Sequence, residues 1–530
     1  MERRTKPARA ILASLCALIV FCAACARQQP PDDNAQTRAD GAKPSVLRIV
    51  TSRKIESLDP VKPGHWFITE FGAAELPLIL DDDYNLKPWM LESFAQADEL
   101  NWRLTLRPNV TFQNGKPLTA AALAACMNRQ LTRSPSTKSV LPDATVAVTG
   151  EREVTLTTLK PDPNVPSALA DEVAFPIYDV ETVEAAGGDA RKLVGSNCYT
   201  GAYRIVSLDD REMRLERFAN YWQGTPPLEA VSVRTVSDAQ ARILAVQSDE
   251  ADIALYPPTE AKRMLANRQD AFFVTSENSG GGPRIFFNVR LAPFDETLVR
   301  RAFSLGINYE ALAKQVMDGV FDTATGFYPP SFSWAVQNQR TDLEEARRLL
   351  DEAGWRAGAD GGVRAKNNAP LEATFLVYPQ QPDWTTLVTA IQAQLSELGF
   401  RIQIRQVDDI NAAMKNSTDW NVALNSPGII TTGGAPDSSL REHLTTDAEA
   451  NYGAVKDQEL DNLIDELSHT FDRVRRANLL ARIQGIVIAE KAYEVRPVFT
   501  RSRCIVGRRY RNYRPSPQLH HVTYATRPAD

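Results

Sequence analysis

The chain has 530 residues, which is too long for one small domain and long enough for two or three. Hydrophobic residues make up 43% and charged residues 24%, an ordinary globular composition that excludes a disordered or fibrous chain. With 60 basic and 66 acidic residues the formal net charge is −6, so the sequence gives no electrostatic basis for a nucleic-acid partner.

The first 44 residues differ in composition from the rest of the chain. Four basic residues (Arg3, Arg4, Lys6 and Arg9) precede an uncharged run over residues 10–26. A basic start followed by a short apolar core predicts a secretory signal peptide over residues 1–24, because the run is shorter than the roughly 20 apolar residues that a membrane span needs. The polar residues 25–44 are predicted to form a flexible tether.

The end of the apolar run, where Cys22 and two alanines precede Cys25, resembles a bacterial lipobox. The resemblance implies that Cys25 becomes the lipidated first residue of the mature chain, and plain cleavage after an alanine is the alternative. Six cysteines are too few for a disulfide scaffold. Because the mature chain has no cysteine–histidine cluster with zinc spacing, we expect neither a metal site nor a cofactor.

The segments that follow alternate between expected strands and helices. Strands are expected over residues 46–51, 102–106, 145–148, 154–159, 285–289, 371–378 and 401–407. Helices are expected over residues 67–76, 119–131, 237–248, 341–354 and 385–398, with caps at Thr119 and Thr341. In the helix over 237–248, Ala241, Leu244 and Ala245 are expected on the buried side. The strand–helix–strand order over 370–410 predicts parallel pairing, and short turns elsewhere predict mixed sheets.

Residues 86–120 resemble the signature of the family 5 extracellular solute-binding proteins, which are the binding components of peptide and nickel ABC importers. The matching positions in this stretch are Pro88, Leu91, Glu92, Ser93, Phe94, Leu106, Arg107, Val110, Phe112, Gly115, Pro117, Leu118, Thr119 and Ala120. Further phrases of the family match in the same order at residues 200–203, 220–222, 287–288, 299–304, 307–308, 345–355 and 457–464. The resemblance therefore covers roughly residues 45–515.

The family resemblance implies an α/β chain with a two-lobed periplasmic-binding-protein-like fold, mixed sheets and a central ligand cleft. Lobe one is expected to contain residues 45–283 and 497–530, and lobe two residues 284–496. The ligand would bind in the cleft and the lobes would close over it by a hinge motion.

The lobe-two side of the expected cleft differs from that of peptide-binding members, in which a loop carboxylate receives the ammonium group of the peptide. In the corresponding stretch, residues 425–437, no acidic residue lies between Gly428 and Pro436, and Asp437 is the nearest one. The sequence therefore gives weaker support for a contact with a peptide ammonium group, because burying an ammonium group without a countercharge is costly. Arg441 follows, and its guanidinium suits a carboxylate on an anionic ligand, with a solvated surface helix as the alternative. The candidate ligand-binding residues are Asn425, Ser426, Thr431, Asp437 and Arg441 in lobe two and Trp66, Phe67 and Tyr199 in lobe one. Ordinary packing is the alternative for the three aromatic residues.

The resemblance implies the solute-binding component of an ABC importer, located in the periplasm or on the outer face of the cytoplasmic membrane and anchored there by lipid. Its expected partners are a small peptide or peptide-like solute, or a metal-chelating compound, and an ABC permease in the membrane. An envelope sensor or chaperone on the same fold is an alternative. An envelope hydrolase is disfavoured, because the sequence lacks nucleophile-elbow, zinc-hydrolase and phosphate-loop motifs. The grouping Asp249, Glu250 and Asp252 fits a solvated helix end better than paired catalytic carboxylates.

Overall fold

The computed structural model describes residues 45–529 except residues 188, 359–361, 427–434 and 519. The predicted signal peptide, the Cys25 lipidation site, most of the tether and Thr431 lie outside the described residues. Pro44–Asp530 form one compact unit.

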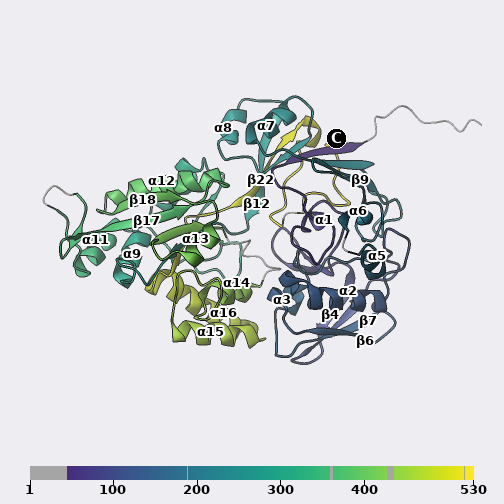
Figure 1. The fold of residues 1–530 in the computed structure, drawn as a ribbon, viewed down its shortest axis with the longest axis horizontal. Coiled ribbons are helices and arrows are strands. Elements are labelled where there is room, and N and C mark those ends of the chain that lie inside the picture. Colours follow the sequence, from purple (N-terminus) through teal and green to yellow (C-terminus); the bar gives the residue numbers. More distant parts are fainter. Residues whose placement is uncertain (1–44, 188, 359–361, 427–434, 519, 530) are drawn as a thin grey trace, which may run out of the picture. The chain divides into compact units, whose positions relative to one another are not determined.

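A seven-stranded mixed sheet has the strand order β12-β22-β11-β1-β10-β9-β8. In chain order its strands are β1 (Val46–Thr51), β8 (Tyr203–Leu208), β9 (Glu212–Arg217), β10 (Ala230–Thr235), β11 (Ile253–Leu255), β12 (Ala271–Ser279) and β22 (Arg501–Gly507). Strand β1 pairs in parallel with both β10 and β11, and the other pairs are antiparallel. Helices α7 (Ala239–Gln247) and α8 (Ala261–Leu265) pack on one face, where their apolar side chains share a cluster with Val50, Ala254 and Ile505 (Figure 1).

A five-stranded sheet has the order β18-β17-β19-β13-β20. Its strands are β13 (Arg284–Phe287), β17 (Glu372–Val377), β18 (Arg401–Gln406), β19 (Val422–Asn425) and β20 (Glu494–Val495). Strand β17 is parallel to β18 and β19, whereas β13 is antiparallel to β19 and β20. Helices α9 (Thr297–Leu305), α11 (Leu343–Glu352) and α12 (Pro382–Ser396) share one apolar cluster with this sheet, and α13 (Ile410–Asn416) packs in a second cluster with Phe286, Leu376 and Ala423 (Figure 1).

A four-stranded antiparallel sheet, β4-β5-β7-β6, packs against α2 (Ala120–Arg133). Its strands are β4 (Leu91–Gln96), β5 (Asn101–Leu106), β6 (Thr145–Val148) and β7 (Glu153–Thr157). Three two-stranded sheets pair β2 (Leu78–Leu80) with β3 (Leu86–Pro88), β14 (Asp322–Thr323) with β21 (Val498–Phe499) and β15 (Ala365–Lys366) with β16 (Ala369–Pro370). The remaining α-helices are α1 (Phe67–Glu70), α3 (Pro135–Val140), α4 (Val165–Ala168), α5 (Val180–Ala185), α6 (Ala190–Leu193), α10 (Tyr309–Ala311), α14 (Pro436–Leu444), α15 (Gln458–His469) and α16 (Arg473–Gln484).

Several expected elements are confirmed with small shifts of their ends. Thr119 caps α2 by accepting the amide of Ala122, and β17 and β18 pair in parallel around α12 as expected. The expected capping box at Thr341 is wrong, because Asp342 caps α11 while the Thr341 hydroxyl donates to the carbonyl of Ile307 at 2.6 Å. The Asp342 carboxylate, one residue further along the chain, therefore has the capping role that was predicted for Thr341.

The expected buried face of α7 is wrong for Ala241 and Leu244 and confirmed for Ala245. Leu244 is 59% exposed, and the buried side chains are Arg242, Ile243, Ala245 and Val246. The helix is turned so that Ile243 and Val246 pack in the cluster beneath β1 and β11.

Two further observations bear on the sequence predictions. Cys126, Cys198 and Cys504 are buried free thiols, and burial raises the pKa of Cys126 to about 12 and that of Cys198 to about 11. Within the described ranges, none of the helices has the length and apolar character that a membrane crossing requires.

Candidate functional site

The carboxyl ends of parallel strands from the two large sheets face one cavity of about 600 Å³. Arg53 follows β1, Ser237 follows β10 and Tyr256 follows β11, and all three line the cavity. From the five-stranded sheet, Tyr378 follows β17 and Ser426 follows β19, and both line it as well. Open α/β sheets bind ligands at the carboxyl ends of their strands, and this volume lies in the usual range of small-molecule sites.

Two helices also begin at the cavity. Ala239 at the start of α7 and Pro382 at the start of α12 both line it. The amino-terminal end of a helix carries a partial positive charge, so both helix ends favour an anion in the space between them. Gln381, the N-cap residue of α12, makes no side-chain capping bond and lines the cavity too.

One buried arginine, Arg242, connects the strand ends on the side of the cavity formed by the seven-stranded sheet. The Arg242 guanidinium donates to the carbonyls of Val236 and Ser237 at 2.8 Å and to that of Tyr256 at 3.0 Å. These carbonyls lie just beyond β10 and β11, so Arg242 holds the two strand ends together. Burial lowers the pKa of Arg242 from its ordinary value.

Two other arginines at the cavity are paired with carboxylates. Arg501 donates to both oxygens of Asp322 at 3.0 and 2.7 Å. Arg503 donates to the carbonyl of Pro257 at 2.8 Å and to Asp383 Oδ2 at 2.6 Å. Since Asp383 lies in the first turn of α12 and Arg503 lies on β22, this ion pair joins the start of α12 to the seven-stranded sheet beside the cavity.

Arg53 differs from these three in its surroundings. Its guanidinium carbon lies 4.9 Å from the ring centre of Trp66 and 4.2 Å from that of Tyr256, so it stacks on two aromatic rings. Tyr256 has φ +54°, a left-handed conformation that is costly for a bulky residue and recurs at ligand-binding positions. Its hydroxyl donates to Glu70 Oε1 at 2.7 Å.

Of the three aromatic residues predicted on the lobe-one side, one lies beside a cavity-lining residue and two lie in the core. Trp66 is half-buried and supports Arg53 at the cavity. Phe67 and Tyr199 are buried in the core of the large apolar cluster. The Tyr199 hydroxyl donates to the carbonyl of Leu58 and so helps to hold the turn over residues 57–60.

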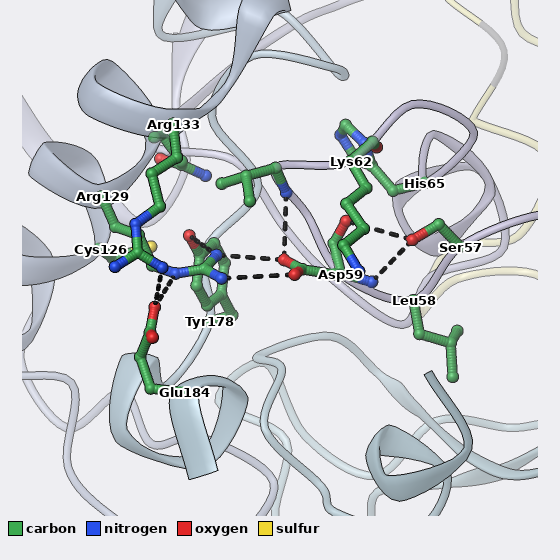
Figure 2. Close-up of polar contacts among 12 residues, drawn as sticks. Ser57, Leu58, Asp59, Lys62, His65, Cys126, Arg129, Arg133, Tyr178 and Glu184 are labelled. Carbon is green, nitrogen blue, oxygen red and sulfur yellow. Dashed lines mark hydrogen bonds and ion pairs between the residues drawn. The ribbon is translucent and has the colours of Figure 1, made fainter. Parts of the chain in front are cut away.

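That turn is also held by a buried ion pair between Arg129 and Asp59 (Figure 2). Arg129 on α2 donates to the two oxygens of Asp59 at 3.1 and 3.4 Å and to the Tyr178 hydroxyl at 3.0 Å, and its Nε donates to Glu184 at 2.5 Å. The turn lies between Arg53 and Trp66 in the chain, so this network holds the segment that connects the two stacked residues.

The predicted lobe-two residues are also dispersed. Ser426 lines the cavity, and Asn425 is buried with its amide donating to Asn411 Oδ1 at 2.7 Å. The buried Asp437 carboxylate accepts the Asn164 amide at 2.5 Å and pairs with Arg476 at 3.2 Å. Arg441 does not line the cavity; it borders two other surface hollows and donates to Ser468 Oγ at 3.5 Å.

Sequence reasoning missed Arg53, Tyr256, Asp383 and Arg503. Two of these residues could have been found from the sequence. Arg53 follows the expected strand over residues 46–51, and Tyr256 follows a short apolar segment, and ligand sites of α/β sheets lie at the carboxyl ends of strands. Asp383 and Arg503 had no such signal, since each acts through a partner more than a hundred residues away. Over the described part of the chain, no group of three or more His, Cys, Asp or Glu side chains is arranged to hold a metal ion.

Known proteins resemble this chain in sequence and in fold. The family model of bacterial extracellular solute-binding proteins, family 5 Middle, matches residues 85–451. The nickel-binding protein NikA of Staphylococcus aureus (strain NCTC 8325 / PS 47) is 24% identical over 442 residues, which cover 82% of this chain and 84% of NikA. The glutathione-binding protein GsiB of Salmonella typhi is 29% identical over 345 residues, and the match spans 62% of each chain, less than two thirds of GsiB.

The crystal structure of NikA from Brucella suis in complex with Fe(III)-EDTA superposes with a TM-score of 0.82 at 18% identity, covering 91% of this chain and 100% of that one. This likeness shows the fold of the two-domain periplasmic binding proteins. With the mixed α/β sheets described above, it confirms the predicted fold class.

Proposed function

Because the chain belongs to family 5 of the bacterial extracellular solute-binding proteins, we propose that it is the extracytoplasmic solute-binding component of an ABC importer. It captures a small peptide or peptide-like solute, or a metal-chelating compound, and delivers it to a membrane permease. The relatives named as nickel-binding and glutathione-binding proteins support this range of ligands.

The observation that carries the proposal is the cavity between the carboxyl ends of the two sheets. Its walls combine four arginines and the amino-terminal end of α7 on the side of the seven-stranded sheet with the amino-terminal end of α12 and the neutral polar groups of Tyr378, Gln381 and Ser426 on the other side, where Asp383 is paired with Arg503. Such a site binds and orients a solute without a nucleophile–base pair, and the relatives are named as binding proteins. We therefore propose binding rather than catalysis.

Closure over the ligand belongs to the same proposal. We assign residues 45–283 and 497–530 to lobe one and residues 284–496 to lobe two, a division supported by the two large sheets, whose strands come from these separate ranges. Arg503 and Asp383 would then join the lobes beside the bound solute, and the permease would recognise the closed form.

Membership of an extracellular family supports a location outside the cytoplasm, and we propose that lipid on Cys25 anchors the protein to the membrane. Replacing the thiol removes the only group that lipid can be attached to in this motif. Cys25→Ser is therefore expected to move the protein from the membrane fraction to the soluble fraction in cell fractionation. An unchanged membrane fraction would remove the anchor and leave the binding function standing.

Native mass spectrometry of the full chain purified from its own host tests the proposed function. We expect a non-covalent adduct of a small solute that is lost when the protein is unfolded and dialysed, and that binds again after refolding. A chain that carries no adduct and binds none of the solutes in a peptide- and chelate-containing extract would overturn the proposal.

A further inference from the structure

Four arginines line the cavity, and three of them donate hydrogen bonds to other groups of the protein. Arg242 donates to backbone carbonyls, Arg501 to Asp322, and Arg503 to Asp383 and a carbonyl. For the fourth, Arg53, no described residue accepts a hydrogen bond from its guanidinium or forms an ion pair with it. Arg53 is thus the cavity arginine whose planar donors remain available to a solute.

The position of the Arg53 guanidinium is set by its two aromatic neighbours. Trp66 and Tyr256 both lie against it, at 4.9 and 4.2 Å from their ring centres. Tyr256 is itself held by its hydrogen bond to Glu70 and by its left-handed backbone. A guanidinium held in this way loses little side-chain entropy when it forms two parallel hydrogen bonds to a carboxylate.

Nearby acidic groups stabilise the positive charge of Arg53, but none of the described residues forms an ion pair with its guanidinium. Burial opposes its charge, but Tyr256, Glu70 and Glu172 raise the pKa of Arg53 above its ordinary value. Glu70 is already engaged, since its Oε1 lies 3.1 Å from His521 Nε2. Burial, followed by repulsion from Glu70 and Asp171, raises the pKa of Glu172 to about 8, so this carboxyl group is largely protonated at neutral pH.

Resting on the proposed function, we propose that Arg53 is the specificity-determining residue of the cavity and that it binds a carboxylate group of the solute from the lobe-one side. The solute is therefore an anionic, carboxylate-bearing compound whose remaining polar groups meet the neutral side chains of Tyr378, Gln381 and Ser426. The carboxylate contact expected at Arg441 is replaced by one at Arg53, because Arg53 lines the cavity and Arg441 does not.

The test separates solutes by charge. A casein hydrolysate is supplemented with glutathione and with Ni(II)–L-histidine, and an anion exchanger divides it into an anionic and a non-anionic fraction. The full chain is freed of solute by unfolding and refolding, and each fraction is then added to it separately. Thermal unfolding reports binding. We expect the anionic fraction to stabilise the wild-type protein, and mild esterification of that fraction, which blocks carboxylates but leaves phosphates charged, to abolish the effect.

Variants then locate the contact. Arg53→Gln is expected to need about 30-fold or more of the anionic fraction for half-maximal stabilisation, and Arg53→Lys to recover part of the binding, because lysine keeps the charge without the planar fork. Arg107→Gln is the matched control, since Arg107 stacks on Trp222 at 5.0 Å but does not line the cavity, and it is expected to bind like wild type.

The outcomes distinguish the inference from the proposed function. If neither fraction stabilises the wild-type protein, the proposed function fails and the inference falls with it. If only the non-anionic fraction binds, if esterified solutes bind equally well, or if Arg53→Gln binds like wild type while unfolding at the wild-type temperature without solute, the inference fails and the proposed function stands.

Discussion

Glu75 is a buried carboxyl group that no cation approaches among the described residues. Its Oε1 accepts hydrogen bonds from Trp89 Nε1 at 2.9 Å and from the Tyr221 hydroxyl, and Trp222 Nε1 lies 3.3 Å from Oε2. Burial raises the pKa of Glu75 to about 7, and these three donors hold it from rising further. Desolvation favours the neutral form of a buried carboxyl group, and hydrogen bonds from neutral donors offset only part of this effect here.

This shift predicts a dependence of stability on pH. In the unfolded chain the Glu75 carboxyl group titrates near its ordinary value of 4.5, whereas in the folded chain its pKa is about 7. Between these values the folded state holds a proton that the unfolded state has released, so the free energy of unfolding falls as pH rises, by about 3 kcal/mol in total. Glu75→Gln keeps an acceptor oxygen and cannot ionise, so it is expected to remove this loss.

Urea unfolding at pH 5 and pH 8 measures the effect. The Glu75→Gln variant is expected to match wild type near pH 5 and to be more stable at pH 8. Glu92→Gln serves as control because Glu92 is an exposed residue in a surface ion pair with Arg152. Equal pH dependence in wild type and Glu75→Gln would show that Glu75 ionises in the folded chain as it does in the unfolded chain.

Single residues show where the sequence predicted the site and where it did not. For Trp66 the sequence leaves stacking on a ligand and ordinary packing open, and in the structure its ring stacks on Arg53. Tyr199 directly precedes the family phrase at residues 200–203 and is a predicted ligand residue with packing as the alternative, and its hydroxyl donates to the carbonyl of Leu58 in the core. A local phrase places a residue along the chain, but the direction in which its side chain points depends on partners that are distant in sequence.

At the scale of single elements, α7 shows why the buried face of a short helix is hard to predict, since its buried side differs from the expected one at Ala241 and Leu244. The alanines and Leu244 form a plausible stripe, but the packing partner is the strip of Val50, Ala254 and Ile505 on β1, β11 and β22. Ile243 is 1% and Leu244 59% exposed, so the helix buries one of two adjacent aliphatic side chains. A short helix with apolar residues on most sides leaves its rotation undetermined until the sheet beneath it is known.

The adjacent pair in α7 provides a matched test. Ile243→Ala removes a buried side chain from the cluster and is expected to lower the free energy of unfolding by about 2–5 kcal/mol. Leu244→Ala removes an exposed side chain from the same helix and is expected to change it by about 0.5 kcal/mol or less. Urea unfolding compares the two variants, and equal losses would contradict the observed rotation of α7.

At the scale of the whole molecule, the predicted fold class is confirmed, whereas most of the residues that line the cavity are not among the predicted ones, and both results have a physical reason. Parallel pairing of β17 and β18 follows from a local strand–helix–strand order. The cavity instead joins residues that follow β1, β11 and β19 with residues of α12 and β22, separated by up to about 450 positions. Patterns of hydrophobicity determine elements, whereas a site between two sheets depends on how distant strand ends meet.

Two polar clusters connect the proposed lobes, one in the cavity wall and one outside the cavity lining. In the first, Asp383 of lobe two accepts Thr259 Oγ1 at 2.8 Å and pairs with Arg503 of lobe one. In the second, the Asn164 side chain of lobe one donates to Asp437 and accepts from Arg476, both in lobe two. Since Asp437 is completely buried, opening the lobes would expose a carboxylate that Asn164 now covers.

Asn164→Ala is expected to shift the balance towards the open form. It removes both hydrogen bonds that cross between the proposed lobes in this cluster but leaves the Asp437–Arg476 pair within lobe two. Buried hydrogen bonds to charged groups contribute about 1.5–3 kcal/mol each, and hydrogen bonds to water replace part of this contribution when the lobes open. The free energy of closure is therefore expected to become less favourable by about 2 kcal/mol, which lowers the ratio of closed to open protein roughly 30-fold. Asn114→Ala is the control, because its amide donates to Asp179 at 2.9 Å inside lobe one.

Small-angle scattering with and without the solute that native mass spectrometry identifies measures this balance. The wild-type radius of gyration is expected to fall on binding, and Asn164→Ala is expected to need more solute to reach the same compact form, because part of the binding energy must now drive closure. Asn114→Ala is expected to follow the wild-type curve. If a solute bound tightly to wild type and Asn164→Ala alike and neither radius changed, the two clusters would be static contacts and capture would not involve hinge closure.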